Sequence, residues 1–256
     1  MTTDRTAATE RVPMGSLRKT ALIAGVLYVI TFVSIPTLVL YGAVHDPSYM
    51  VGPGPDTPVV LGGVLEIIVG LAGIGTAVVL YPVVKRQDEA RAMGFVGARV
   101  LEAATIFVGV ASLLTVVTLR QAGSGADGLV AGQALVAFYD RIFILGQGLI
   151  PAVNALLLGS LLYQSRLVPR ALPLLGFIGA ALLVASAAAT VFGLLDRVSP
   201  VSGILAIPIA VWEFSLGVYL IIKGFKPSPI TAGLTASGAS APIRSKRRFP
   251  LTPPLR

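Results

Sequence analysis

Six ionisable side chains lie within apolar stretches of this 256-residue sequence that are long enough to cross a membrane. They are Glu66, Arg99, Glu102, Asp140, Arg141 and Glu213. A charged group near the centre of a membrane helix costs about 2.5 to 3.5 kcal/mol to insert, so such groups pair with one another or face a water-filled cavity. Carboxylates in such places can hold a proton or a small cation, and a neighbouring arginine can balance one of their charges.

Arg99 and Glu102 are one helical turn apart in the apolar stretch 93–119. Residues with this spacing are neighbours on a helix. Thr105 and Ser112 continue the same face, so we expect this face to point into the protein. Two interpretations stay open, because the pair can be part of a polar site or can be a structural ion pair whose arginine reaches toward the headgroups.

Two more glutamates extend this set. Glu66 begins a row of small residues at helical spacing, which would let another helix approach closely, and we expect it to contact a donor such as Arg141. Glu213 lies in the middle of the last apolar stretch. We therefore predict one polar intramembrane site formed by Glu66, Arg99, Glu102 and Glu213. Because one arginine cannot neutralise three carboxylates, at least one of them should be protonated or bound to a ligand.

A second polar pattern follows a period of seven residues. Its members are Gln133, Asp140, Gln147 and Asn154, with Arg141 beside them. This period keeps side chains near one face of a helix. Such a polar seam can form hydrogen bonds between helices or can line a water-filled path, and the sequence allows both.

Several classes of chemistry are disfavoured by composition. The chain has no cysteine and one histidine, which excludes disulfides, iron–sulfur clusters and cysteine nucleophiles. We expect His45, in a loop next to Pro47, to be solvated and to bind no metal. No phosphate-binding, dinucleotide-binding or hydrolase motif is present. We therefore expect no metal and no cofactor, and an enzyme that acts on lipid with carboxylates as acid and base is the least favoured reading.

The elements that must position these residues are membrane helices. The chain is 55% hydrophobic and 12% charged, whereas soluble domains have about 25% charged residues. A membrane crossing takes about 20 mostly apolar residues. Six stretches qualify, at about 19–41, 58–84, 93–119, 129–163, 171–195 and 201–222. The predicted fold is thus an all-α, polytopic bundle of six transmembrane helices.

Two of these spans should be irregular, and both ends of the chain differ from the rest. Pro36 should kink the first span, and the fourth is long enough to be tilted, interfacial or broken. Residues 1–17 are predicted to be a disordered arm, residues 18–225 the membrane domain, and residues 226–256 a disordered basic, Pro-rich tail. A weak similarity between residues 80–98 and 162–180 leaves an internal duplication open.

The distribution of positive charge predicts the orientation. Sixteen Lys and Arg residues lie in the two termini and in the second and fourth connections, whereas the other connections hold only Arg120 and Arg197. Cytoplasmic segments are rich in Lys and Arg, so both termini should be cytoplasmic and the protein should lie in the inner membrane. The net charge of +8 then reflects topology and contacts of the tail with anionic lipid headgroups, not nucleic-acid binding.

Several segments, in order, resemble one family. They include AGVLYVITFV, GFVGARVLEA with Arg99 and Glu102, and WEFSLGVYLIIKGF with Glu213. Over about residues 18–225 the sequence resembles the domain-of-unknown-function 4386 family of bacterial integral membrane proteins. The resemblance implies a membrane-helical fold and supports the choice of acidic residues, but it implies no reaction.

Two functions are consistent with these patterns. In the first, the protein is a small transporter, channel or permeability protein whose buried Glu/Arg site exchanges protons or binds a small ion. In the second, it is a non-catalytic binding or accessory protein in which the buried charges only fix helix packing. The sequence indicates the lipid bilayer as a partner, and it identifies no protein partner.

Overall fold

The computed structural model describes residues 15–46, 48–52, 54–123 and 125–232. Its long helices are α1 (Ser16–Ile30), α3 (Asp56–Val84), α4 (Glu89–Gln121), α5 (Gly125–Gly146), α6 (Ile150–Ser165), α7 (Ala171–Val191) and α8 (Pro200–Ile222). Its short helical turns are η1 (Thr31–Ser34), α2 (Thr37–Leu40), η2 (Ala43–His45) and η3 (Pro229–Thr231). The described part of the chain is therefore all α, as predicted.

Six helical segments are long and apolar enough to cross a membrane. They are Ser16–His45, Asp56–Val84, Glu89–Gln121, Gly125–Ser165, Ala171–Val191 and Pro200–Ile222. Many large apolar side chains on these segments point outward, such as Val39, Leu71 and Ile204. Helices that are apolar on all sides are typical of a membrane. These features identify a multi-pass membrane protein and confirm the prediction of six candidate spans.

The first candidate span is interrupted at Pro36. Proline has no backbone N–H and its ring clashes with the preceding turn, and here α1 gives way to η1 before α2 begins. Two threonine hydroxyls support the irregular segment, since Thr31 donates to the carbonyl of Tyr28 at 2.7 Å and Thr37 donates to that of Ser34 at 2.7 Å. The predicted kink is thus a break in the helix.

The fourth candidate span is also interrupted, at residues 147–149 between α5 and α6. The amide N–H groups of Gln147 and Gly148 both bond to the carbonyl of Phe143 at 2.9 Å. A Cβ on Gly148 would lie 2.4 Å from the carbonyl oxygen of Ile144, so this turn requires glycine. Pro151 lies in the first turn of α6, where its missing N–H costs nothing. Of the three possibilities for the long span, the structure shows the break.

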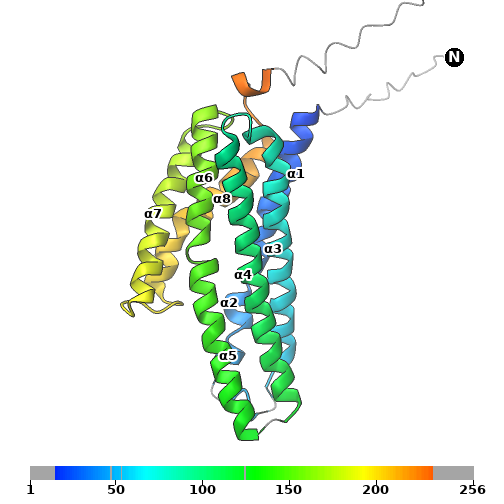
Figure 1. The fold of residues 1–256 in the computed structure, drawn as a ribbon, viewed down its shortest axis with the longest axis vertical. Coiled ribbons are helices and arrows are strands. Elements are labelled where there is room, and N and C mark those ends of the chain that lie inside the picture. Colours follow the sequence, from blue (N-terminus) through cyan, green and yellow to red (C-terminus); the bar gives the residue numbers. More distant parts are fainter. Residues whose placement is uncertain (1–14, 47, 53, 124, 233–256) are drawn as a thin grey trace, which may run out of the picture.

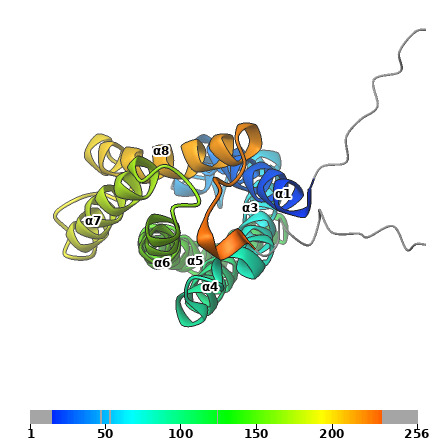
Figure 2. The same cartoon turned by 90° about the horizontal axis from the view of Figure 1, so that it is seen from above.

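The helices pack as a bundle around α3 and α4, which run along its full length without interruption (Figure 1). Helices α5 and α6 follow one another along the α4 side, and both pack against α4. Helix α8 packs against α1 and α7, and α1 packs against α3. Seen from above, the segment with η3 lies among α1, α3, α4, α6 and α8, and α7 lies on the far side of α6 (Figure 2).

Buried apolar side chains form two clusters, one toward each end of the bundle. The first includes Tyr28, Phe95 and Trp212, and the second includes Tyr41 and Tyr139. Small residues allow the close approach of helices in the first cluster. At Gly25 of α1, a Cβ would lie 2.6 Å from the carbonyl oxygen of Gly217 in α8.

The chain after α8 returns to the bundle. The amide of Lys226 donates to the carbonyl of Leu167 at 2.8 Å, and the hydroxyl of Ser228 donates to the carbonyl of Ser165 at 2.6 Å. Carbonyls at the end of a helix have no partner within it, so the contact of Ser228 satisfies the last carbonyl of α6, and the contact of Lys226 holds the connection that follows it. Residues 226–232 of the predicted tail therefore pack on the protein. The predicted disorder of residues 1–14 and 233–256 lies outside the described residues.

Candidate functional site

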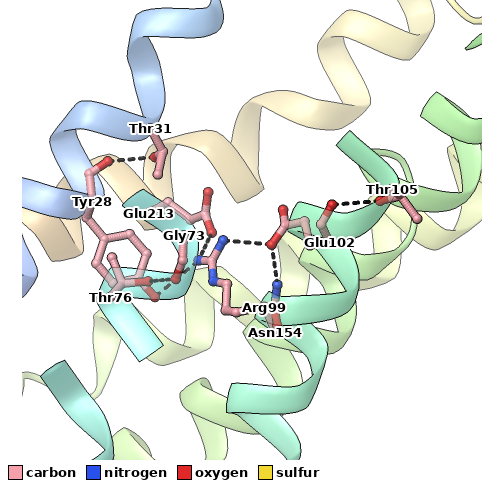
Figure 3. Close-up of polar contacts among 9 residues, drawn as sticks. All are labelled: Tyr28, Thr31, Gly73, Thr76, Arg99, Glu102, Thr105, Asn154 and Glu213. Carbon is pink, nitrogen blue, oxygen red and sulfur yellow. Dashed lines mark hydrogen bonds and ion pairs between the residues drawn. The ribbon is translucent and has the colours of Figure 1, made fainter. Parts of the chain in front are cut away.

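Arg99 of α4 lies between two glutamates. Its Nη1 donates to Oε2 of Glu102 at 2.9 Å, and its Nη2 donates to Oε1 of Glu213 in α8 at 2.7 Å. The three side chains converge between α4 and α8, as Figure 3 shows. The exposed fraction of the side chain is 3% for Arg99, 12% for Glu102 and 16% for Glu213. Three of the four residues predicted to form one site are therefore in direct contact.

Aromatic side chains hold the guanidinium group in place. The hydroxyl of Tyr28 in α1 accepts a bond from Arg99 Nη2 at 3.3 Å. The guanidinium carbon also lies 5.3 Å from the centre of the Tyr28 ring and 5.7 Å from that of Phe95, which are cation–π distances. Gly73 of α3 faces the stem of Arg99, and a Cβ there would lie 3.9 Å from Arg99 Cδ.

Asn154 joins the site from α6. Its Nδ2 donates to Oε2 of Glu102 at 2.8 Å (Figure 3), and the residue is fully buried. Within the described part of the chain, Asn154 Oδ1 and Arg99 Nε are buried without a hydrogen-bond partner. The charged group therefore connects α1, α4, α6 and α8.

A cavity of about 230 Å³ opens beside this group. Arg99, Glu102 and Glu213 form its polar wall. Both helix breaks also line it: the first contributes Thr31, Phe32, Ser34 and Ile35, and the second contributes Gln147 and Pro151. The rest of the wall is apolar and includes Val69, Ile106, Leu183 and Ile209. In membrane transporters, interrupted helices with irregular backbone line the binding site, and this cavity has the same arrangement.

Glu66 lies apart from the other three predicted site residues. It is 1% exposed and accepts hydrogen bonds from the hydroxyls of Tyr41 and Tyr139, both at 3.3 Å, and from Gln147 Nε2 at 3.2 Å. The expected contact with Arg141 is wrong, because Arg141 is exposed. Positions 139 and 141 point to different sides of a helix, so the inward position in α5 belongs to tyrosine. The predicted four-residue site is thus two separate groups.

The polar seam is present over most of its length. Asp140 lies 2.9 Å from Nε of Arg197, Gln147 bonds to Glu66, and Asn154 bonds to Glu102. Gln133, however, is exposed. Gln147 and Asn154 therefore make hydrogen bonds between helices, as the first interpretation of the seam predicts, and Asp140 contacts the connection between α7 and α8. Gln147 also lines the cavity beside Arg99, so the second interpretation, a water-filled path, stays open.

His45 is not simply solvated as expected. Its Nε2 lies 3.1 Å from Oδ1 of Asp140 and 3.3 Å from Nη2 of Arg197. These three residues, with Tyr41 and Tyr139, line a second cavity of about 310 Å³, which we call the outer cavity. Nothing in the sequence indicated this contact, because 95 residues separate His45 from Asp140.

The tyrosines were also not identified as candidates. Tyr28, Tyr41 and Tyr139 each bring a hydroxyl to one of the two groups. They could have been named as candidates from the sequence, since a tyrosine buried in an apolar helix usually finds a hydrogen-bond partner for its hydroxyl. Which partner each one reaches depends on the two helix breaks, whose geometry the sequence does not specify.

A known family matches most of the chain. The family model described as "Domain of unknown function (DUF4386)" matches residues 23–224. No curated protein and no solved structure matches the chain. The matched region contains both charged groups and both helix breaks described above.

Proposed function

The chain belongs to the DUF4386 family, and we propose that it is a membrane transport protein that carries a small cationic solute through the cavity beside Arg99. The observation that carries this proposal is the meeting of two interrupted spans at one cavity with two carboxylates and one guanidinium group. Broken helices at mid-membrane free backbone groups for a ligand.

The charge of the site favours a cation. Arg99 balances one of the two carboxylates, so with Glu102 and Glu213 both ionised the group has a charge of −1. In the described part of the chain Arg99 and Asn154 use only Glu102 Oε2 and Glu213 Oε1, which leaves the second oxygen of each glutamate for a solute or a proton. A cation in the cavity would complete the charge balance.

The apolar wall favours an organic cation. Leu183, Ile106 and Val69 line the cavity and cannot replace the water around a hydrated metal ion, but they suit the methyl groups of a substituted ammonium ion. Binding sites of this kind combine mostly apolar walls with a few well-placed polar groups. We therefore choose the tetramethylammonium ion as the probe.

The test is uptake of labelled tetramethylammonium into proteoliposomes that contain the purified protein. We expect Glu102→Gln and Glu213→Gln each to lower the uptake rate by about ten-fold or more, the equivalent of about 1.4 kcal/mol of lost interaction. Both variants leave one carboxylate beside Arg99, so the ion pair persists. The matched control is Asp127→Asn, which changes an exposed acid at the start of α5. Wild-type uptake in both glutamate variants would contradict the proposal.

A second candidate function has one observation in its favour. Arg99 is 3% exposed and contacts side chains from two other helices, as a purely structural ion pair would. An accessory protein of this kind would show no uptake by the wild type, and Glu102→Gln would change only its thermal stability in detergent.

We also propose an orientation, in the inner membrane, with the start of α1 and the segment after α8 in the cytoplasm. These two segments lie at the same end of the bundle (Figures 1 and 2). The excess of Lys and Arg in the termini and in the second and fourth connections supports this assignment. The basic tail would then lie against anionic headgroups of the cytoplasmic leaflet.

A further inference from the structure

We infer that Glu66 is a proton-exchange site that is separate from the cavity beside Arg99, which we call the solute cavity. We infer further that Glu66 couples transport to protons that enter from the outer cavity. The coupling rests on the proposed function, whereas proton exchange at Glu66 stands independently of it. Glu66 is suited to this task by its contacts, by its place between two cavities, and by the absence of a contacting cation among the described residues.

The contacts of Glu66 serve two protonation states. A carboxylate accepts hydrogen bonds from all three partners, the hydroxyls of Tyr41 and Tyr139 and the amide of Gln147. A hydroxyl accepts as well as donates, so either tyrosine can instead accept a bond from the protonated carboxyl group. The two rings meet edge to face, with centres 5.4 Å apart, which holds both hydroxyls in reach of Glu66 in either state.

The other surroundings of Glu66 are neutral except on one side. On the α4 side, the residues that contact the neighbouring glycines of α3 are Val110 and Phe107. On the outer side, the guanidinium carbon of Arg197 lies 5.6 Å from the centre of the Tyr139 ring, and the hydroxyl of Tyr139 donates to Glu66. Arg197 is itself paired with Asp140 and next to His45. A change of charge in this outer group therefore acts on Glu66.

Glu66 also lies between two cavities. Tyr41 and Tyr139 line the outer cavity of about 310 Å³. Gln147 lines the solute cavity together with Arg99 and Glu102. Each side of Glu66 thus faces one cavity through its own hydrogen-bond partners.

The proton transfer can be written in balanced form. A hydronium ion in the outer cavity gives a proton to the hydroxyl oxygen of Tyr41 or Tyr139, and that hydroxyl passes its own proton to the Glu66 carboxylate. The products are water, a neutral tyrosine and a protonated Glu66. Release toward the solute cavity transfers the proton from the protonated carboxyl group to a water molecule there, which forms a hydronium ion and leaves the Glu66 carboxylate.

The first experiment measures tetramethylammonium uptake into proteoliposomes with and without a transmembrane pH difference. We expect the pH difference to raise wild-type uptake several-fold, and Glu66→Gln to abolish this increase while uptake down the solute gradient persists. Asp127→Asn is the control and should keep the increase. An increase that persists in Glu66→Gln would overturn the inference and leave the proposed function intact.

The second experiment does not depend on transport. Infrared difference spectra of the whole protein in liposomes, recorded between about pH 4 and pH 9, should contain a protonated-carboxyl band that disappears with rising pH and is missing in Glu66→Gln. Tyr139→Phe and Tyr41→Phe keep the rings and remove the hydroxyls, so each should shift the midpoint of this band. These two variants also test the inference if Glu66→Gln does not fold. A band that is the same in wild type and in these variants would overturn the inference, even if no uptake is found.

Discussion

Arg99 is the residue at the centre of the charged group. It contacts Glu102 and Glu213 and lies against the rings of Tyr28 and Phe95. The cost of placing ions in an apolar span allowed both glutamates and the arginine to be predicted from the sequence. The same argument could not assign Glu66 to a separate group, because its partners are neutral and carry no charge signal.

Removing this arginine should be costly. Arg99→Met leaves Glu102 and Glu213 close together without a cation, and breaking a buried ion pair from one side costs about 3 to 5 kcal/mol. Denaturant unfolding in detergent micelles measures this loss. The control is Arg141→Met, an exposed arginine, for which we expect a change within about 0.5 kcal/mol. Equal stability of the two variants would mean that Arg99 is not holding the acids together.

A second prediction at this scale concerns Tyr49, in the connection between the first two spans. Burial and the hydrogen bond to Asp56 raise the pKa of Tyr49 to about 12. A raised pKa in the folded state means that this contribution to stability is full below the unfolded value of about 10 and is lost as the pH rises through about 12. Tyr49→Phe should therefore flatten the fall in unfolding free energy across that interval. An unchanged alkaline slope would contradict this assignment.

At the scale of the elements, the six candidate spans could be predicted from hydropathy and length, and the interruption at Pro36 from the chemistry of proline. The break at residues 147–149 could not be located, since neither Gly148 nor the adjacent Gln147 by itself ends a membrane helix. Helix α7 also ends at Val191 and not at 195. Gly193 has a φ of +72°, a left-handed conformation that is typical of residues following a helix end.

The turn between α5 and α6 gives a prediction of its own. Gly148→Ala places a Cβ against the backbone carbonyl of Ile144, so the turn must shift, and we expect a loss of about 1 to 3 kcal/mol. The control is Gly97→Ala in α4, where a Cβ meets nothing within 4 Å and alanine favours the helix by about 1 kcal/mol. Thermal unfolding in detergent compares the two. A stabilising effect of both substitutions would show that the break does not need glycine.

At the scale of the whole molecule, the distribution of charge predicts which end faces the cytoplasm. The chain contains no cysteine, so single cysteines can report their own accessibility. We expect Asp127→Cys to react with a membrane-impermeant maleimide added to intact cells, and Lys226→Cys to react only after the cells are opened. Both positions are exposed. The reverse pattern of labelling would invert the proposed orientation.

The two interrupted spans lie beside two uninterrupted helices, α3 and α4. A continuous helix resists bending, whereas a helix without its ladder of hydrogen bonds at one level can bend there as a joint. The joints at residues 31–36 and 147–149 share one cavity wall. Tilting α2 and α5 against α1 and α6 would therefore change the shape of that cavity, while α3 and α4 keep their positions.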